Sequence, residues 1–203
     1  LANAPIRWGL TGTVPKERFE FEAIRCSLGE VINSIPAHEL QAQGVLSNCH
    51  VNVLQTTDLK EFRSYTDETK YLVTDKERMS WLANTIKNIS KTGNTLVLVN
   101  RIESGKILIN ELPEAVFVSG EVKNKHRKEE YDEVKTSTDK IIVATYGVAA
   151  VGINIPRIFN LVLLEPGKSF VRVIQSIGRG IRKAEDKDFV QIWDITSTCK
   201  YAK

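Results

Sequence analysis

Residues 168–183 combine basic side chains with glycine in a pattern suited to binding a highly charged anion. The segment contains five Lys or Arg residues and no Asp or Glu. If it forms a helix, Gln175, Arg179 and Arg182 share one face, because they follow one another at spacings of four and three residues. Two guanidinium forks and an amide suit an oxyanion such as a triphosphate. Gly178 and a second glycine flank Arg179 and let a phosphate come close, which favours a binding helix over a plain solvated one.

A second segment with binding chemistry follows an apolar run at residues 141–145. Its small residues extend to Gly152 and Asn154 and offer backbone N–H groups, while Thr145 adds a hydroxyl. At the carboxyl edge of a parallel sheet, such groups can hold a phosphodiester or a ribose. Small residues after a strand also permit tight packing, so both interpretations stand at this point. The other expected strand ends at this edge carry further pairs: Asn100-Arg101, Ser119-Gly120 and Glu165-Pro166.

Several other chemistries lack the residues that they need. No GxxxxGK[ST] phosphate loop is present, and Gly9–Thr13 lacks both its spacing and its lysine. The acidic pairs Asp132-Glu133 and Asp67-Glu68 lie in charged stretches instead of ending an apolar strand, so we interpret both as solvated. The three histidines are far apart and show no metal-ligand spacing, so no metal site is expected.

The composition is that of a folded globular chain. It has 203 residues, of which 42% are hydrophobic and 26% charged, and its net charge of +3 does not by itself indicate a polyanionic partner. Three tryptophans lie in apolar runs and are expected in the core: Trp8, Trp81 and Trp193. Three widely spaced cysteines are interpreted as small buried residues in a reducing cytosol: Cys26, Cys49 and Cys199. With no targeting or membrane-spanning pattern, a cytoplasmic location is expected.

The elements that must position these groups alternate between strand and helix. Apolar runs of strand length occur at residues 6–10, 45–57, 95–99, 115–118, 140–144, 160–164 and 189–193. Helical patterns occur at residues 36–43, from a cap at 74–75 to Gly93, and at 102–112, 123–135 and 169–181. In the last helix, we expect an apolar stripe of Phe170, Ile174 and Ile177 to pack on the sheet. Continuous Val, Ile and Leu strands are buried on both faces, which predicts an α/β fold with a parallel, helix-covered sheet. Residues 14–70 are the least regular part.

Four segments, in the family's order along nearly the whole chain, resemble motifs of superfamily-two helicases. Residues 175–182 (QSIGRGIR) match the QxxGRxxR pattern of motif VI, which is quite specific. Residues 145–154 resemble motif V, with Asn154 where many members have Asp, and residues 95–101 resemble motif IV. Residues 9–13 (GLTGT) resemble motif III. The combination is most similar to the UvsW-type recombination and repair helicases of T-even-like phages.

This resemblance implies a RecA-like (P-loop NTPase-type) fold and a boundary near residue 25. Residues 1–25 would be the tail of a first RecA-like domain, and residues 26–203 the second RecA-like domain. ATP with Mg²⁺ would be bound mainly by the first domain, which lies outside this sequence. The second domain would supply three catalytic side chains, two of them arginine fingers on the γ-phosphate: Arg179, Arg182 and Gln175. Three further residues would approach the nucleotide: Gly152, Asn154 and Gly178.

The resemblance also implies two partners, DNA (single-stranded or branched) and the first RecA-like domain of the same polypeptide. The backbone of one DNA strand would be held by groups at the strand ends: Thr145, Asn100, Arg101, Ser119 and Gly120. The motif III residues would couple the nucleotide state to this surface: Thr11, Gly12 and Thr13. No metal ligand is expected within this chain.

Three functions remain open from the sequence. The leading one is the C-terminal motor domain of an ATP-dependent DNA helicase or translocase of repair or recombination, in a bacterial or phage-infected cytoplasm, inactive without its ATP-binding domain. A restriction or remodelling translocase subunit shares these motifs without separating strands. A non-catalytic nucleic-acid-binding module that has lost its partner domain is the third. The missing phosphate loop fits both a module and a truncated chain, but a degenerate module has little reason to keep both arginines, and the first residue, Leu1, favours truncation.

Overall fold

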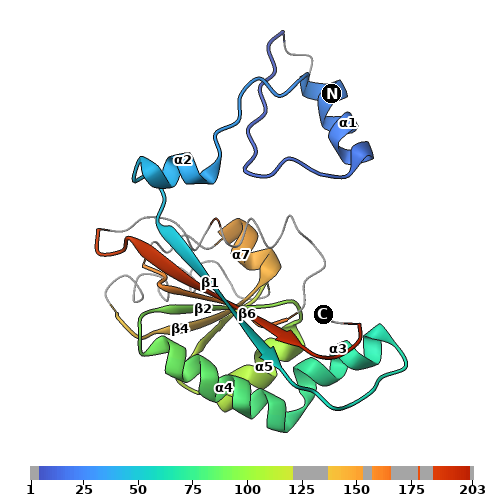
Figure 1. Cartoon of the computed structure of the whole chain (residues 1–203), viewed down its shortest axis with the longest axis vertical. Coiled ribbons are helices and arrows are strands. Elements are labelled where there is room, and N and C mark those ends of the chain that lie inside the picture. Colours follow the sequence, from blue (N-terminus) through green and yellow to red (C-terminus); the bar gives the residue numbers. More distant parts are fainter. Residues whose placement is uncertain (1–4, 121–136, 153–156, 166–177, 179–184, 202–203) are drawn as a thin grey trace.

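The predicted parallel sheet is present at the centre of the computed structural model (Figure 1), which describes residues 5–120, 137–152, 157–165, 178 and 185–201. Among these residues six strands pair in the order β1-β6-β5-β2-β4-β3, and every neighbouring pair is parallel. Their bounds are Asn48–Thr56 (β1), Thr95–Val99 (β2), Val116–Val118 (β3), Ile141–Thr145 (β4), Asn160–Leu163 (β5) and Phe189–Ser197 (β6). The α/β prediction is therefore confirmed, and six of the seven predicted strands lie where they were expected.

Helices cover both faces of this sheet, because side chains along each central strand alternate between two apolar cores. In β2, Val97 and Val99 point into the core beneath α4 (Lys76–Ser90) and α5 (Ile102–Glu111). Leu96 and Leu98 point into the core that includes α7 (Tyr146–Gly152) on the opposite face. The helix α3 (Tyr65–Thr74) packs beside α4. In α5, Gly105 permits close packing, since a Cβ there would collide with the Phe117 ring of β3.

The start of α4 is fixed by the side-chain cap that the sequence predicts. Asp75 accepts a hydrogen bond from the backbone N–H of Arg78 at 3.1 Å, which satisfies one of the free donors of the first turn. A hydroxyl caps α3 in the same way, because Ser64 Oγ accepts from the backbone N–H of Asp67. That helix was not predicted from the sequence, since no apolar run marks it.

The N-terminal segment departs from the prediction. Residues 6–10 form no strand, and the side chains of Ile6, Trp8 and Leu10 are 72%, 75% and 99% exposed. Their apolar run has no neighbouring strand among the described residues with which to pair. The segment continues into α1 (Arg18–Leu28), which has no buried residue, and α2 (Ala37–Ala42), where a helix was predicted.

Other expectations about burial are wrong in part. Trp81 is 48% exposed on the outer side of α4, and Trp193 is only partly buried. Cys26 and Cys49 are exposed because their helix and edge strand are uncovered on that side, whereas Cys199 is buried. The predicted helices at 123–135 and 169–181, including the Phe170 stripe and Asp132-Glu133, lie outside the described residues.

The acidic pair Asp67-Glu68 is not solvated as a unit. Asp67 is exposed, but Glu68 is fully buried and accepts the backbone N–H of Tyr201 at 2.8 Å and 3.1 Å. The carboxylate of α3 therefore fastens the end of the chain to this helix. Its partner is 133 residues away in sequence, so the local charge pattern could not reveal it.

A buried ion pair joins the edge of the sheet to α4. Arg78 donates to the Asp58 carboxylate at 2.9 Å, and these side chains are only 7% and 6% exposed. Asp58 also accepts from Ser197 at 2.6 Å and from Thr56 at 2.7 Å. Burial alone would raise the pKa of Asp58, but these hydrogen bonds and the Arg78 charge outweigh it and lower the pKa. The carboxylate thus ties together β1, β6 and α4.

Candidate nucleic-acid interface

The parallel sheet brings the predicted strand-end groups to one edge. The carboxyl ends of β2, β4 and β3 lie side by side, since Val99 pairs with Thr145 and Val118 with Ala144. Asn100-Arg101 follows β2, Ser119-Gly120 follows β3, and Thr145 ends β4. Polar groups as far apart in sequence as Asn100 and Thr145, which are separated by 45 positions, are therefore neighbours at this edge.

These residues differ in how far they reach the surface. Asn100 and Gly120 are exposed, while Arg101 and Thr145 are half-buried. A Cβ placed on Gly120 would have no atom within 4 Å, so there is room beside its Cα. Ser119 is only 3% exposed, so its side chain lies beneath the surface that a ligand would contact. The outward-facing groups are thus an amide, a guanidinium, a hydroxyl and an open backbone.

The helix α5 begins at this edge and adds a positive electrostatic end. Its N-cap is Arg101, whose side chain makes no capping hydrogen bond. The free N–H groups of a helix's first turn, with the helix dipole, favour negatively charged groups. Anion-suited donors from α5 therefore lie beside the strand ends.

A buried carboxylate lies behind this surface, and the sequence reasoning gave it no role. Glu165, just after β5, is 3% exposed, and its Oε1 accepts the backbone N–H of Arg101 at 3.5 Å. Its Oε2 and the buried Ser104 hydroxyl have no partner within hydrogen-bond geometry among the described residues. Burial raises the pKa of Glu165, opposed by the nearby Ser104 hydroxyl, by the backbone N–H groups of Arg101 and Asn100 and by the Arg101 charge. An acidic residue directly after the apolar run 161–164 was the available signal.

Tyr146 interacts electrostatically with this carboxylate and with a second one, that of Asp194. Tyr146, at the start of α7, is 4% exposed, and burial together with the charges of Glu165 and Asp194 raises its pKa. Burial also raises the pKa of Asp194 in β6. The phosphate-suited groups therefore form a thin layer above an acidic interior, which limits how tightly this edge alone can hold a polyanion.

The other predicted site residues are only partly described. Gln175, Arg179, Arg182 and Asn154 lie outside the described residues, and Gly152 is the last residue of α7. Gly178 is exposed, and a Cβ there would have nothing within 4 Å. This open backbone is the feature that the sequence reasoning required for a nearby phosphate.

The motif III residues form a turn in the N-terminal segment. Thr11 Oγ1 donates to the Thr13 carbonyl at 2.9 Å and accepts the Thr13 N–H at 3.1 Å, while Gly12 between them is exposed. This segment lies beyond α2, away from the sheet (Figure 1), so the structure does not bring it to the strand ends.

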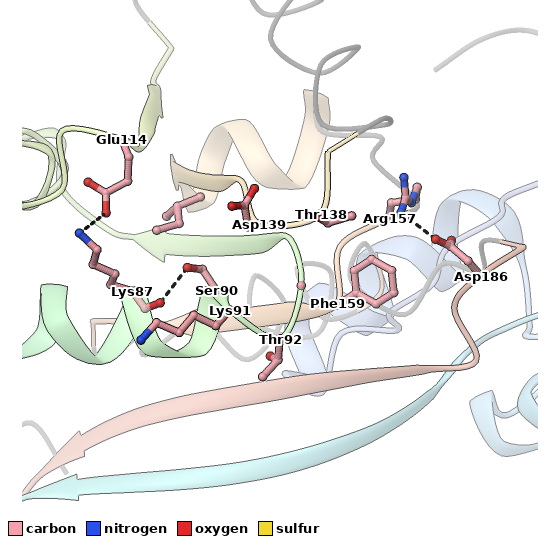
Figure 2. A pocket seen from close by; sticks show the side chains of 12 residues that line it. Lys87, Ser90, Lys91, Thr92, Glu114, Thr138, Asp139, Arg157, Phe159 and Asp186 are labelled. Atoms are coloured by element: carbon pink, nitrogen blue, oxygen red, sulfur yellow. Dashed lines mark hydrogen bonds and ion pairs between the residues drawn. The ribbon is translucent and has the colours of Figure 1, made fainter.

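A hollow at the opposite edge of the sheet has different chemistry (Figure 2). Gly93, Asp139 and Phe159, which precede β2, β4 and β5, contribute to its lining. Two of its basic groups are paired with acids, in the Lys87–Glu114 contact at 3.1 Å and the Arg157–Asp186 contact at 2.8 Å, while Lys91 donates to the Asn88 amide oxygen. Because it lies at the amino ends of the strands and most of its positive charge is neutralised locally, we do not assign it to phosphate binding.

The described part of the chain contains neither a metal-ligand cluster nor a membrane-spanning helix. No three His, Cys, Asp or Glu side chains there gather into a group that could hold a metal ion. No helix there is both long and apolar enough to cross a membrane.

The sheet is fully parallel and helices cover both of its faces, and the solved helicase structures that it resembles show that the α/β fold is RecA-like. The chain belongs to the family of helicase conserved C-terminal domains, which matches residues 77–184, more than half of its length. It is similar to the ATP-dependent DNA helicase uvsW of Enterobacteria phage T4, with 28% identity over 207 residues, covering 96% of this chain and 41% of that protein.

Two further similarities agree with this family. A putative helicase of Sulfolobus islandicus filamentous virus is 34% identical over 104 residues, covering 49% of this chain and 18% of that protein. The crystal structure of T4 UvsW superimposes with a TM-score of 0.63 and 26% identity, covering 75% of this chain and 33% of that chain. The sequence thus spans less than half the length of the helicases that it resembles.

Proposed function

We propose that this chain is the C-terminal motor domain of an ATP-dependent DNA helicase of repair or recombination, acting in a bacterial or phage-infected cytoplasm. Its carboxyl sheet edge holds the sugar-phosphate backbone of one DNA strand through Asn100, Arg101 and Thr145, with room for the strand to approach at Gly120. The observation that carries this proposal is the meeting of these groups on adjacent strands beside the start of α5. They match phosphates better than base edges, so the binding is independent of sequence.

The nucleotide role rests on the motif VI segment. Arg179 and Arg182 act as arginine fingers and Gln175 positions the γ-phosphate, in a cleft completed by a first RecA-like domain. The open space around Gly178 fits the approach of a phosphate to the backbone. Mg²⁺ does not fit the described residues, which hold no suitable ligand cluster. We assign the ion, with most of the ATP contacts, to the first domain.

The grip on DNA is tested by fluorescence anisotropy with labelled single-stranded oligonucleotides at several salt concentrations. Wild-type protein should bind weakly and without sequence preference. Because Arg101 is the one cationic side chain among the proposed contacts, the logarithmic salt slope should be shallow, about −0.7. Arg101→Ala should weaken binding and make the slope shallower by about 0.7, because it removes one phosphate contact.

A matched control separates this grip from general charge. Lys106 is an exposed basic residue of the same helix, away from the strand ends, so Lys106→Ala should leave affinity nearly unchanged. Thr145→Ala should weaken binding without altering the salt slope, since a neutral hydroxyl releases no counterion. Tight binding that ignores salt, or equal losses in the Arg101 and Lys106 variants, would contradict the proposal.

A further inference from the structure

We propose that Glu165 is a positioning residue, which holds the backbone of Asn100-Arg101 from behind so that Arg101 faces the DNA strand. The DNA-binding test of this inference rests on the proposed function, whereas its hydrogen-exchange test does not. Glu165 follows β5, which pairs with β2 in the centre of the sheet, so its side chain lies next to the loop that follows β2. The Leu164 N–H also donates to the Leu98 carbonyl at 3.1 Å, which fixes the origin of the Glu165 side chain relative to that loop.

The loop has little else to hold it. Arg101 is the N-cap of α5, yet its own side chain does not cap the helix, so the turn between β2 and α5 lacks the usual local fastening. Glu165 supplies an acceptor from another strand, with its Oε1 3.5 Å from the Arg101 nitrogen. A negative carboxylate is also favourable beside the positive end of a helix. Glu165 therefore accepts the backbone N–H of the N-cap residue, as the Glu at position N3 of a capping box does.

Burying the Glu165 carboxylate costs stability, which argues that the residue has a functional role. A 97%-buried carboxylate is unusual, and one of its oxygens has no hydrogen-bond partner among the described residues (3% exposed, Oε2 unpaired). An unsatisfied buried polar atom costs stability, and an apolar side chain would fill the same space without that cost. Tyr146 lies near this carboxylate and does not neutralise it. The ionised form is favoured by the Ser104 hydroxyl, by the backbone N–H groups of Arg101 and Asn100, and by the Arg101 charge.

Two variants of equal charge and similar volume test the role. Glu165→Met removes both the charge and the acceptor, whereas Glu165→Gln removes the charge but keeps an acceptor oxygen. In Glu165→Met we expect amide hydrogen exchange at Asn100 and Arg101 to accelerate about tenfold, because one hydrogen bond is worth roughly that factor. Exchange at Leu96 and Val97 should not change. Glu165→Gln should restore most of the protection.

The DNA readout separates positioning from charge. If Glu165 acted only as a repulsive negative charge, both variants would bind DNA more tightly than wild type. If it positions the loop, Glu165→Met should bind about three- to tenfold more weakly and Glu165→Gln within about twofold of wild type. Glu103→Gln removes an exposed carboxylate from the first turn of the same helix and should alter neither loop exchange nor affinity beyond a small electrostatic gain.

Failure of this inference and failure of the proposed function are distinguishable. Unchanged exchange at Asn100 and Arg101 in Glu165→Met, or equal exchange in the Met and Gln variants, would overturn the positioning role whatever the DNA result. Absence of DNA binding by wild-type protein would overturn the proposed function, while the exchange measurement would still decide the role of Glu165.

Discussion

Replacing Asp58 with alanine should destabilise the protein strongly, because it leaves a buried positive charge without its counter-ion. The Asp58 carboxylate accepts hydrogen bonds from Arg78, Ser197, Thr56 and Tyr71. With the carboxylate removed, the Arg78 guanidinium keeps two hydrogen-bond acceptors in the described part of the chain, Thr56 Oγ1 at 2.6 Å and the Leu72 carbonyl at 3.1 Å. These neutral acceptors satisfy hydrogen bonds but not the charge.

The size of the effect follows from how deeply the pair is buried. Removing one partner of a buried ion pair typically costs about 3–5 kcal/mol. Since Arg78 retains two acceptors, we expect the lower end, about 3 kcal/mol. For a domain of this size, that corresponds to a decrease in Tm of roughly 6–12 °C. The exposed pair Lys87–Glu114, with side chains 59% and 39% exposed, supplies the contrast, and Glu114→Ala should cost less than about 1 kcal/mol.

Urea denaturation followed by circular dichroism measures both variants. The double variant Asp58→Ala with Arg78→Met should recover part of the loss, because it removes the uncompensated charge. If Asp58→Ala is no more destabilising than Glu114→Ala, or if the double variant is additive, the carboxylate does not act as described here.

The same variant has a pH signature. The folded-state pKa of Asp58 lies below its usual 3.8, so the carboxylate's contribution is fully present above that value and is lost as pH falls through the folded pKa. The stability difference between wild type and Asp58→Ala should therefore be constant near neutrality and shrink below about pH 4. A difference that grows on acidification would refute the reasoning.

Three further outcomes are expected. The 203-residue chain alone should not hydrolyse ATP at a measurable rate in a coupled assay, and rapid turnover would refute this. In a full-length parent protein, Arg179→Ala should preserve ATP binding but reduce turnover by about 10³-fold or more. Acrylamide should quench the fluorescence of Trp8 and Trp81, which are 75% and 48% exposed, more than that of Trp193, as single-tryptophan variants can show. Burial lowers the pKa of Lys187 to about 8. Between about pH 8 and 10 the unfolded protein therefore binds more protons than the folded protein, so wild type should gain stability relative to Lys187→Met as the pH rises. A loss of relative stability over this range would contradict the prediction.

The central sheet was predictable because the apolar composition of its strands shows that they are buried on both faces. Thr95–Val99 is apolar at nearly every position, as a strand buried on both faces must be, and the structure has β2 at these residues. The start of α4 was predictable because Asp75 satisfies the helix locally, without a distant partner. Local signals of these two kinds place the edge at which Asn100 and Thr145 meet.

The errors share a different cause, which is that burial depends on what lies nearby in space. Residues 6–10 have the apolar pattern of a strand, but burial requires a neighbour that the described chain does not provide. Glu68 has the pattern of a solvated residue, yet Tyr201 folds back onto it. Glu165 was visible as a strand-end position, but its backbone partner Arg101 lies in the loop after β2, 64 positions earlier in the sequence.

The pairing of β1 with β6 has a consequence for how the protein is made on the ribosome. Asn48 pairs with Phe189 and Thr56 with Ser197, so β1 receives its only described neighbour from a strand that is translated 141 residues later. At about 5–20 residues per second, β1 waits on the order of ten seconds for that partner. During this interval β1, with Val51 and Val53, and the uncovered side of β5 both present free strand edges. A nascent chain stalled before residue 189 would therefore be a natural client for chaperones that shield such edges.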